Sequence, residues 1–342
     1  MPDRRAFLQS MAAAAASPWL CGESGATADP AGSLLGEARV LLLVELQGGN
    51  DALNTVIPWA DSAYFALRPT LAVPRAAVLR LDGTTGLHPA LRPLMRLWEA
   101  GELAIVRGVG CPVATLSHAR SISAWDTGAT DGGATRGWIA RALEHAGNAG
   151  AMAIDGATGP LAGCDARGHG PWPCSPIGSD PYLAFAQALR DAARIAATPG
   201  GPAAIKLSLR GFDTHVAQAK THARLLGALA SGLATLATEL KQSGRWDRVM
   251  VITYSEFGRR AAENGQGGTD HGTGGLQLVL GGAVSGGFHG AGPRLDALDA
   301  AGGIPCETDF RRVYAAVLED WWCMPSAPVL GDRYDPLPLV RA

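Results

Sequence analysis

The sequence lacks a long hydrophobic run. Although 47% of its 342 residues are hydrophobic, no apolar stretch approaches the roughly 20 residues that a membrane-spanning helix needs. This absence argues against a membrane-spanning protein and predicts a soluble one. A chain of this length and apolar content can bury a large core, in one large domain or in two smaller ones.

A strong charge of either sign is also missing. The 29 lysines and arginines nearly balance the 31 aspartates and glutamates, which leaves a formal net charge of −2. Proteins that bind nucleic acid carry clustered basic residues, so we expect no nucleic-acid partner. Glycine and proline, at 45 and 22 residues, are abundant instead, and they predict long and numerous loops.

The amino terminus has the features of an export signal. Arg4 and Arg5 precede a weakly apolar stretch, and residues 26–28 form a small-x-small cleavage site. This order is typical of twin-arginine signals; the alternative is a chance basic pair on a surface helix. We therefore predict a signal peptide at residues 1–28, a single domain at residues 29–342, and a periplasmic or secreted location.

Export by this route would place the five cysteines that follow the predicted signal peptide in an oxidising compartment. Cys164 and Cys174 flank a loop rich in glycine and proline, and they could form a disulfide there. The sequence alone does not pair Cys111, Cys306 or Cys323.

Strand and helix patterns alternate beyond residue 38. Short apolar runs typical of buried strands lie at residues 40–46, 103–106, 204–209, 249–253 and 276–280. Helical periodicity occurs at residues 90–99 and 182–197, and in a leucine stripe over residues 226–240 that is too short for a coiled coil and indicates core packing. This alternation predicts an α/β fold with a doubly wound, mainly parallel sheet sandwiched by helices.

Polar side chains follow these strand ends. The candidates are Asp51, Ser117, His118, Asp213, His215, Ser255, Glu256, Asp270 and His271. Because the carboxyl ends of parallel strands meet at one edge of a sheet, we expect these groups to lie close together. Carboxylates and imidazoles suit a divalent metal such as zinc, calcium or magnesium. The alternative is a purely structural polar network.

Ser117 precedes a predicted helix, which allows two interpretations. Serine is a common N-cap, so its hydroxyl could simply accept a backbone hydrogen bond. The amino terminus of a helix also stabilises an anionic substrate or transition state, which would make Ser117 a candidate nucleophile beside His118. Neither residue decides between these interpretations alone.

Six segments give the chain a family resemblance. They are LLLVELQGGNDALNTVIPW (41–59), GLHPAL (86–91), TLSHARSISAW (115–125), GFDTHVAQ (211–218), VITYSEFGRRAAENGQGGTDHG (251–272) and DFRRVYAAVL (309–318). Together they resemble the twin-arginine-exported proteins grouped as the domain-of-unknown-function family numbered 1501. That family is placed in the alkaline phosphatase and sulfatase superfamily, so the resemblance implies an alkaline phosphatase-like α/β sandwich.

The resemblance also implies roles for individual residues. Superfamily enzymes use a metal-assisted nucleophile on phosphate or sulfate esters, and Ser117 stands at the nucleophile position. The implied metal ligands and their neighbours are Asp51, Asp213, His215, Glu256, Asp270 and His271.

The sequence thus predicts an exported, metal-dependent hydrolase acting on a small anionic phosphate or sulfate ester. In this prediction Asp213, His215 and His271 hold the metal, Ser117 attacks, and Arg259 or Arg260 neutralises the ester oxygens; for the arginines the alternative is a solvated face. The alternative function is a non-catalytic periplasmic binding or assembly factor that retains the fold. The sequence identifies no protein partner.

Overall fold

The computed structural model describes residues 39–113, 115–147, 150–154, 158–164 and 180–341. All of them belong to one compact unit, Ser33–Ala342. Arg4, Arg5 and Cys174 lie outside the described residues, so the export signal and the Cys164 disulfide stay predictions. None of the helices in this described part combines the length and the apolar character required to span a bilayer.

An eight-stranded sheet forms the centre of the unit, in the order β10-β5-β9-β8-β1-β7-β6 with β11 paired to β5. Its strands are β1 Val40–Gln47, β5 Leu103–Gly110, β6 Ala151–Ala153, β7 Ala204–Arg210, β8 Val249–Tyr254, β9 Gly275–Leu280, β10 Gly287–His289 and β11 Thr308–Asp309. A second, three-stranded sheet contains β2 Val56–Ile57, β3 Leu79–Arg80 and β4 Gly86–Leu87. The predicted strands at residues 40–46, 103–106, 204–209, 249–253 and 276–280 are therefore all present.

The sheet is mainly parallel, as predicted, with one reversed strand. β1 pairs in parallel with both β7 and β8, whereas β9 is antiparallel to both β8 and β5. Since β5 and β8 both run against β9, they point the same way as each other and as β1 and β7. The carboxyl ends of these four strands therefore meet at one edge of the sheet.

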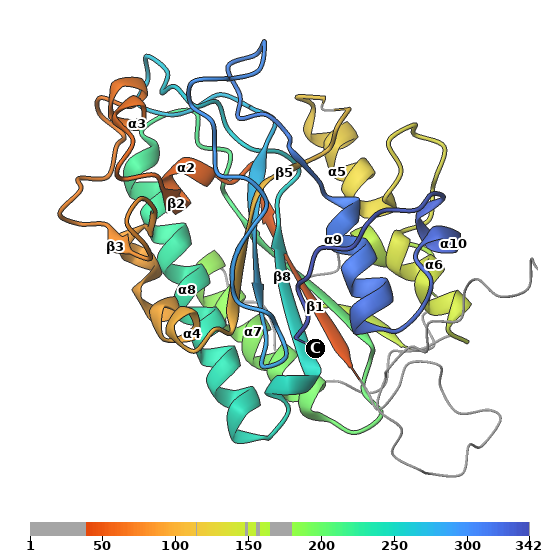
Figure 1. Ribbon diagram of the computed structural model, residues 1–342. Helices are drawn as coiled ribbons and strands as arrows, with labels where there is room; N and C mark the ends of the chain where they lie inside the picture. The colour runs from red at the N-terminus through yellow and green to blue at the C-terminus, as the bar shows by residue number, and fades with distance from the viewer. Residues whose placement is uncertain (1–38, 114, 148–149, 155–157, 165–179, 342) are drawn as a thin grey trace, which may run out of the picture. The chain divides into compact units, whose positions relative to one another are not determined.

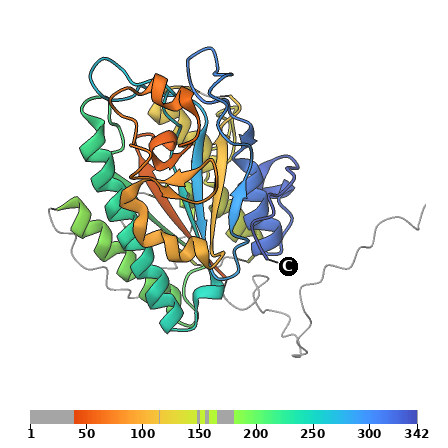
Figure 2. The same ribbon diagram turned by 60° about the vertical axis from the view of Figure 1, so that its left-hand side comes forward.

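Helices cover both faces of the sheet (Figure 1). One face carries η1 Pro89–Leu94, α4 Met95–Glu99, α7 Pro181–Ala197 and α8 Gln218–Gln242, and the other carries α5 His118–Thr127, α6 Trp138–His145, α9 Arg311–Ala316, the π-helical η5 Val317–Trp321 and α10 Ala327–Leu330. Figure 2 shows the green α7 and α8 on the opposite side of the sheet from the blue carboxyl-terminal helices. The shorter helical segments are α2 Ala52–Thr55, α3 Ser62–Leu67, η2 Gly159–Leu161 and η4 Trp246–Arg248.

Two hydrophobic cores result, one on each face. Val249 and Val251 of β8 enter the first core, whereas Met250 and Ile252 enter the second. Every residue of β8 is buried, which confirms the prediction of a strand covered on both faces. The leucine stripe of α8 is buried in the first core, so it packs against the sheet as expected.

The helix predicted at residues 90–99 is divided. Residues Pro89–Leu94 form a 3-10 helix, and only Met95–Glu99 is α-helical. Pro93 lies inside the first part, and it has no N–H to donate to the carbonyl of Pro89 four residues earlier. The apolar periodicity was sufficient to predict a helix but not its type.

A buried polar cluster interrupts the second core beneath the site-bearing edge. The Lys206 ammonium lies 2.7 Å from the Glu45 carboxylate, and Ser208 donates a hydrogen bond of 3.0 Å to Glu45. Asp126 of α5 is the titratable neighbour of this pair, and its Oδ1 is buried without a hydrogen-bond partner in the described part of the chain. Burial, and then the negative charges of Glu45 and Glu256, raise the pKa of Asp126 to about 7.

Asp126→Asn is expected to stabilise the protein at pH 8. Because the folded pKa of about 7 exceeds the usual 3.8, the folded state binds more protons between these values and stability falls as pH rises through that window. The neutral amide should add about 4 kcal/mol at pH 8 and almost nothing near pH 4. Urea unfolding at both pH values measures this difference, with Asp131→Asn at an exposed position as the control. Equal gains at pH 8 and pH 4 would contradict it.

Candidate functional site

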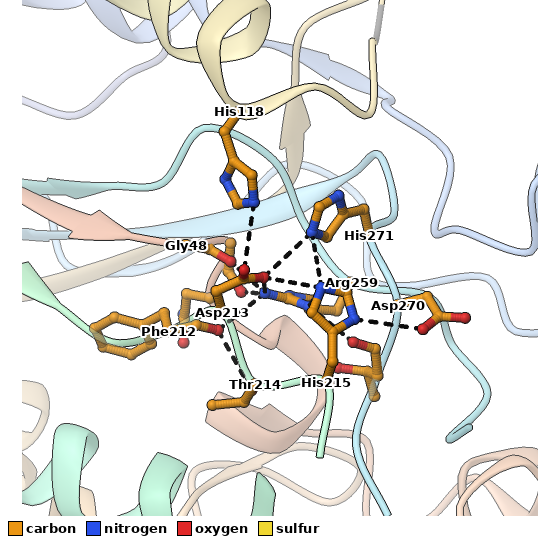
Figure 3. Close-up of polar contacts among 12 residues, drawn as sticks. Gly48, His118, Phe212, Asp213, Thr214, His215, Arg259, Asp270 and His271 are labelled. Carbon is orange, nitrogen blue, oxygen red and sulfur yellow. Dashed lines mark hydrogen bonds and ion pairs between the residues drawn. The ribbon is translucent and has the colours of Figure 1, made fainter. Parts of the chain in front are cut away.

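The sheet edge brings together side chains from two strand exits and one returning loop (Figure 3). Asp213 and His215 follow β7, and His118 is the first residue of α5, beyond β5. His271 lies in the loop that leads from β8 back to β9. The predicted convergence of Asp213, His215, His271 and His118 is therefore present in the structure.

The four side chains face one another through particular atoms. Asp213 Oδ1 lies 3.0 Å from His215 Nε2 and 3.2 Å from His271 Nε2, and these two nitrogens are 3.0 Å apart. The second oxygen of Asp213, Oδ2, lies 3.6 Å from His118 Nε2. Ligand atoms of His118, Asp213 and His271 all lie within 4.8 Å of one another, a spacing compatible with one metal ion. Two overlapping triads thus share Asp213 and His271.

The other nitrogen of each imidazole is held from outside the cluster. His118 Nδ1 lies 2.7 Å from Glu256 Oε1, and His271 Nδ1 lies 3.0 Å from the carbonyl oxygen of Leu116. His215 Nδ1 lies 3.4 Å from Asp270 Oδ1. An outer carboxylate or carbonyl on one ring nitrogen, with the other nitrogen facing inward, is the usual environment of a histidine that binds a metal.

Arg259 supports the cluster from its buried side. Its side chain has no exposed surface, and it donates to the carbonyl oxygens of Gly48, Gly49, Phe212 and Thr269 and to Asp213 Oδ1. These acceptors occupy the guanidinium, so the expectation that Arg259 contacts ester oxygens needs correction. Arg260 is 43% exposed and lies 3.8 Å from Asp270, on the outer side of the cluster.

Asp213 of the cluster and its outer neighbour Asp270 both favour the ionised form. Partial burial raises the pKa of Asp213, but the hydrogen bond from Arg259 and the charge of Arg259 outweigh it, and the pKa lies below its ordinary value. The hydrogen bond from Asn264 is the main cause that lowers the pKa of Asp270. At neutral pH the site therefore offers carboxylates as acceptors or as metal ligands.

Asp51 is not part of this cluster. It is the N-cap of α2, and its buried carboxylate lies 2.6 Å from the buried guanidinium of Arg68. Gln218 of α8 donates a further hydrogen bond to the same oxygen. Since these partners already satisfy the carboxylate, the structure separates Asp51 from the metal-ligand position at which the sequence placed it.

Ser117 and Glu256 border the cluster. Ser117 is exposed and occupies the N-cap position of α5, but its side chain makes no capping hydrogen bond, so the capping interpretation is wrong. Glu256 is buried behind His118, with which it forms the 2.7 Å contact. Its carboxylate also accepts hydrogen bonds from the backbone N–H groups of Gly48 and Gly49.

Sequence reasoning missed the structural importance of Gly48 and Gly49. Their φ angles are +115° and +83°, a region that favours glycine. A Cβ atom on Gly48 would lie 2.3 Å from the backbone nitrogen of Asp213, and one on Gly49 would lie 2.5 Å from the Phe257 ring. Two adjacent glycines directly after a buried strand were the available signal, because such pairs mark close backbone approach.

The fold and the site define the class of this protein: a mixed α/β protein with a histidine and carboxylate cluster at the carboxyl edge of its sheet. The family model described as "Protein of unknown function (DUF1501)" matches residues 185–307. Of the six segments that carried the resemblance, those at residues 211–218 and 251–272 lie inside this range. No curated protein matches the chain.

Solved structures with a similar fold include a member of the alkaline phosphatase superfamily. A protein of that superfamily from Vibrio parahaemolyticus has 11% identity and a TM-score of 0.45, over 89% of this chain and 75% of its own. The C-terminal periplasmic domain of EcEptC from Escherichia coli, in complex with Zn, has 9% identity and a TM-score of 0.43, over 73% of this chain and 75% of its own.

The murine ectonucleotide pyrophosphatase/phosphodiesterase 5 is also similar, with 13% identity and a TM-score of 0.34 over 64% of this chain. The match covers 57% of the murine chain. At these identities and TM-scores the likenesses do not define the activity of the present chain.

Proposed function

We propose that the cluster binds a divalent metal ion and that the protein hydrolyses a phosphate or sulfate ester. The ligands in this proposal are Asp213, His215 and His271, and His118 is the further ligand on the opposite oxygen of Asp213. The substrate is a small anionic ester, as the sequence predicted. Arg259 is buried, and its N–H groups already donate to the acceptors described above, so it does not contact the substrate directly.

One observation carries the metal proposal, the environment of His271. A carbonyl oxygen only accepts hydrogen bonds, so the contact with Leu116 O at 3.0 Å places the hydrogen of the neutral ring on Nδ1. The lone pair of Nε2 then faces the Asp213 carboxylate at 3.2 Å. Electron-rich atoms repel at this distance, and a cation between them converts the repulsion into binding.

The donor set favours zinc among the three predicted metals. Calcium and magnesium prefer oxygen ligands, whereas imidazole nitrogen suits zinc. Ligand atoms about 2.0–2.1 Å from a tetrahedral zinc lie about 3.3 Å from one another. The observed spacings of 3.0, 3.2 and 3.6 Å around Asp213 fit that geometry.

The residues around this centre suit attack on an anionic ester. A bound divalent ion supplies positive charge that stabilises the developing negative charge on the ester oxygens. Ser117 presents an exposed hydroxyl at the start of α5, next to His118. In our proposal this hydroxyl attacks phosphorus or sulfur, the alcohol leaves, and water then hydrolyses the ester formed on Ser117.

Elemental analysis tests the metal proposal. We expect about one zinc per chain, and removal by a chelator should lower the melting temperature by about 5 °C, because the ion binds only the folded state. His271→Gln should weaken zinc binding at least about 100-fold. The same substitution at His145, an exposed residue at the end of α6, should leave zinc binding unchanged.

Two results would count against the proposal. A metal-free protein whose melting is unaffected by chelator or added zinc would leave only the structural polar network. A zinc-loaded protein that turns over no ester in a broad panel of phosphate and sulfate esters would favour the non-catalytic binding or assembly factor.

A further inference from the structure

Glu256 makes an unusual set of contacts for a side chain at a candidate metal site. Its side chain is only 6% exposed. Oε1 lies 2.7 Å from His118 Nδ1 and also accepts the Gly48 N–H at 2.9 Å. Oε2 accepts the Gly49 N–H at 3.2 Å and the Ser255 hydroxyl at 3.3 Å. Backbone and hydroxyl donors therefore fix the carboxylate, and among the residues that the structure describes the one imidazole in contact with it is that of His118.

His118 differs from the other two histidines in how it is held. The outer partner of His271 is a neutral carbonyl, and that of His215 is a carboxylate 45% exposed at the longer distance of 3.4 Å. His118 alone has a buried carboxylate on Nδ1. Its ring also packs against Phe257, with the centroids 4.8 Å apart. Glu256 and Phe257, which follow β8 in the chain, thus hold the His118 ring at its Nδ1 atom and at its face.

We propose that Glu256 is a positioning residue and not a metal ligand: it keeps the hydrogen of His118 on Nδ1 and directs Nε2 toward Asp213. The inference rests on the proposed metal site and assigns one determinant of its affinity. A charged acceptor on the outer nitrogen fixes the tautomer of a ligating histidine and increases its basicity. In the other tautomer, Nε2 would carry a hydrogen and could not bind a metal.

The glycine pair ties this contact to the rest of the cluster. The N–H groups of Gly48 and Gly49 point to Glu256, and their carbonyl oxygens accept from Arg259. Arg259 in turn holds Asp213 at 2.7 Å. The same two residues therefore connect the support of His118 with the support of Asp213, which keeps the two inward-facing groups in a fixed relation.

The first experiment measures zinc affinity by competition with a chelating indicator. Glu256→Gln keeps the size of the side chain but removes its charge, and an amide oxygen turned toward His118 places the amide NH2, which only donates, against the Gly49 N–H. We expect the affinity for zinc to fall 10- to 100-fold. Glu307→Gln, at an exposed position, should leave the affinity unchanged.

A double-mutant cycle shows whether Glu256 acts through His118. In the His118→Gln background, Glu256→Gln should cause little further loss of zinc affinity, because the histidine that it positions is absent. A loss as large as in the wild-type background would overturn the inference, since Glu256 would then bind the metal itself or act elsewhere.

The nitrogen NMR spectrum of the metal-free wild-type protein supplies a readout that needs no folded Glu256 variant. The His118 signals, assigned by their loss in His118→Gln, should show hydrogen on Nδ1 and none on Nε2. An Nε2–H tautomer would overturn the inference whatever the zinc result. If the protein binds no zinc but His118 has the expected tautomer, the proposed function is wrong while the contact that we assign to Glu256 holds.

Discussion

Replacing Arg259 with lysine is expected to lower the free energy of unfolding by about 3–5 kcal/mol, the cost of breaking a buried, hydrogen-bonded charge network. The guanidinium donates to four carbonyl oxygens and to Asp213, and these acceptors come from three separate segments of the chain. A lysine keeps the charge but has only three donors at a single atom. It would therefore leave several buried carbonyl groups unpaired.

The adjacent residue provides the control for this prediction. Arg260→Lys changes the same side chain in the same way, but Arg260 is 43% exposed and its ion pair with Asp270 is long, at 3.8 Å. Exposed ion pairs of this kind contribute about 0–1 kcal/mol. Urea unfolding of the metal-free proteins compares the two variants without any contribution from zinc. Equal losses would show that Arg259 does not have the structural role described here.

Arg259→Lys should also weaken the metal site. Asp213 is held on one side by Arg259 at 2.7 Å and is otherwise 47% exposed, so its carboxylate would gain rotational freedom. We expect a fall in zinc affinity of at least about 10-fold, comparable to the loss of an outer-shell partner. A variant that is destabilised but binds zinc as tightly as the wild type would separate the two roles.

Much of the fold could be predicted because apolar runs report burial directly. The run at residues 249–253 has no polar break, and β8 is indeed covered on both faces. The convergence of Asp213, His215 and His271 was predictable for a related reason, since parallel strands end at a common edge. The reversed direction of β9 had no comparable signal, because an apolar run looks the same in either direction.

The roles of individual polar residues were harder to predict, because they depend on partners far away in the sequence. Asp51 and Asp213 both follow a strand, but Arg68 reaches only Asp51 and removes it from the site. Arg259 and Arg260 are neighbours that point to opposite sides of an extended segment, one inward and one outward. Nothing in the sequence distinguishes the two arginines. Arg259 is the buried one because it lies against Gly49 and donates to the carbonyl oxygens of the glycine pair.

Ser117→Ala is expected to abolish ester hydrolysis, with a fall in turnover of at least about 10³-fold, if the hydroxyl is the nucleophile. The side chain makes no capping hydrogen bond, so the substitution should change the free energy of unfolding by less than about 0.5 kcal/mol. Zinc content should also be unchanged, because no ligand is removed. Activity would thus be lost while stability and metal are kept.

The control for this substitution lies in the same helix. Ser123→Ala alters another exposed serine of α5 and should retain full activity. Mass spectrometry of wild-type protein quenched during turnover should find a phosphate or sulfate group on Ser117, since the alcohol leaves before water attacks. An active Ser117→Ala variant would exclude the serine as the nucleophile and make a water molecule at the metal site the attacking group. Loss of zinc in that variant would instead mean that Ser117 supports the metal centre, and the two steps assigned to its hydroxyl would have to be withdrawn.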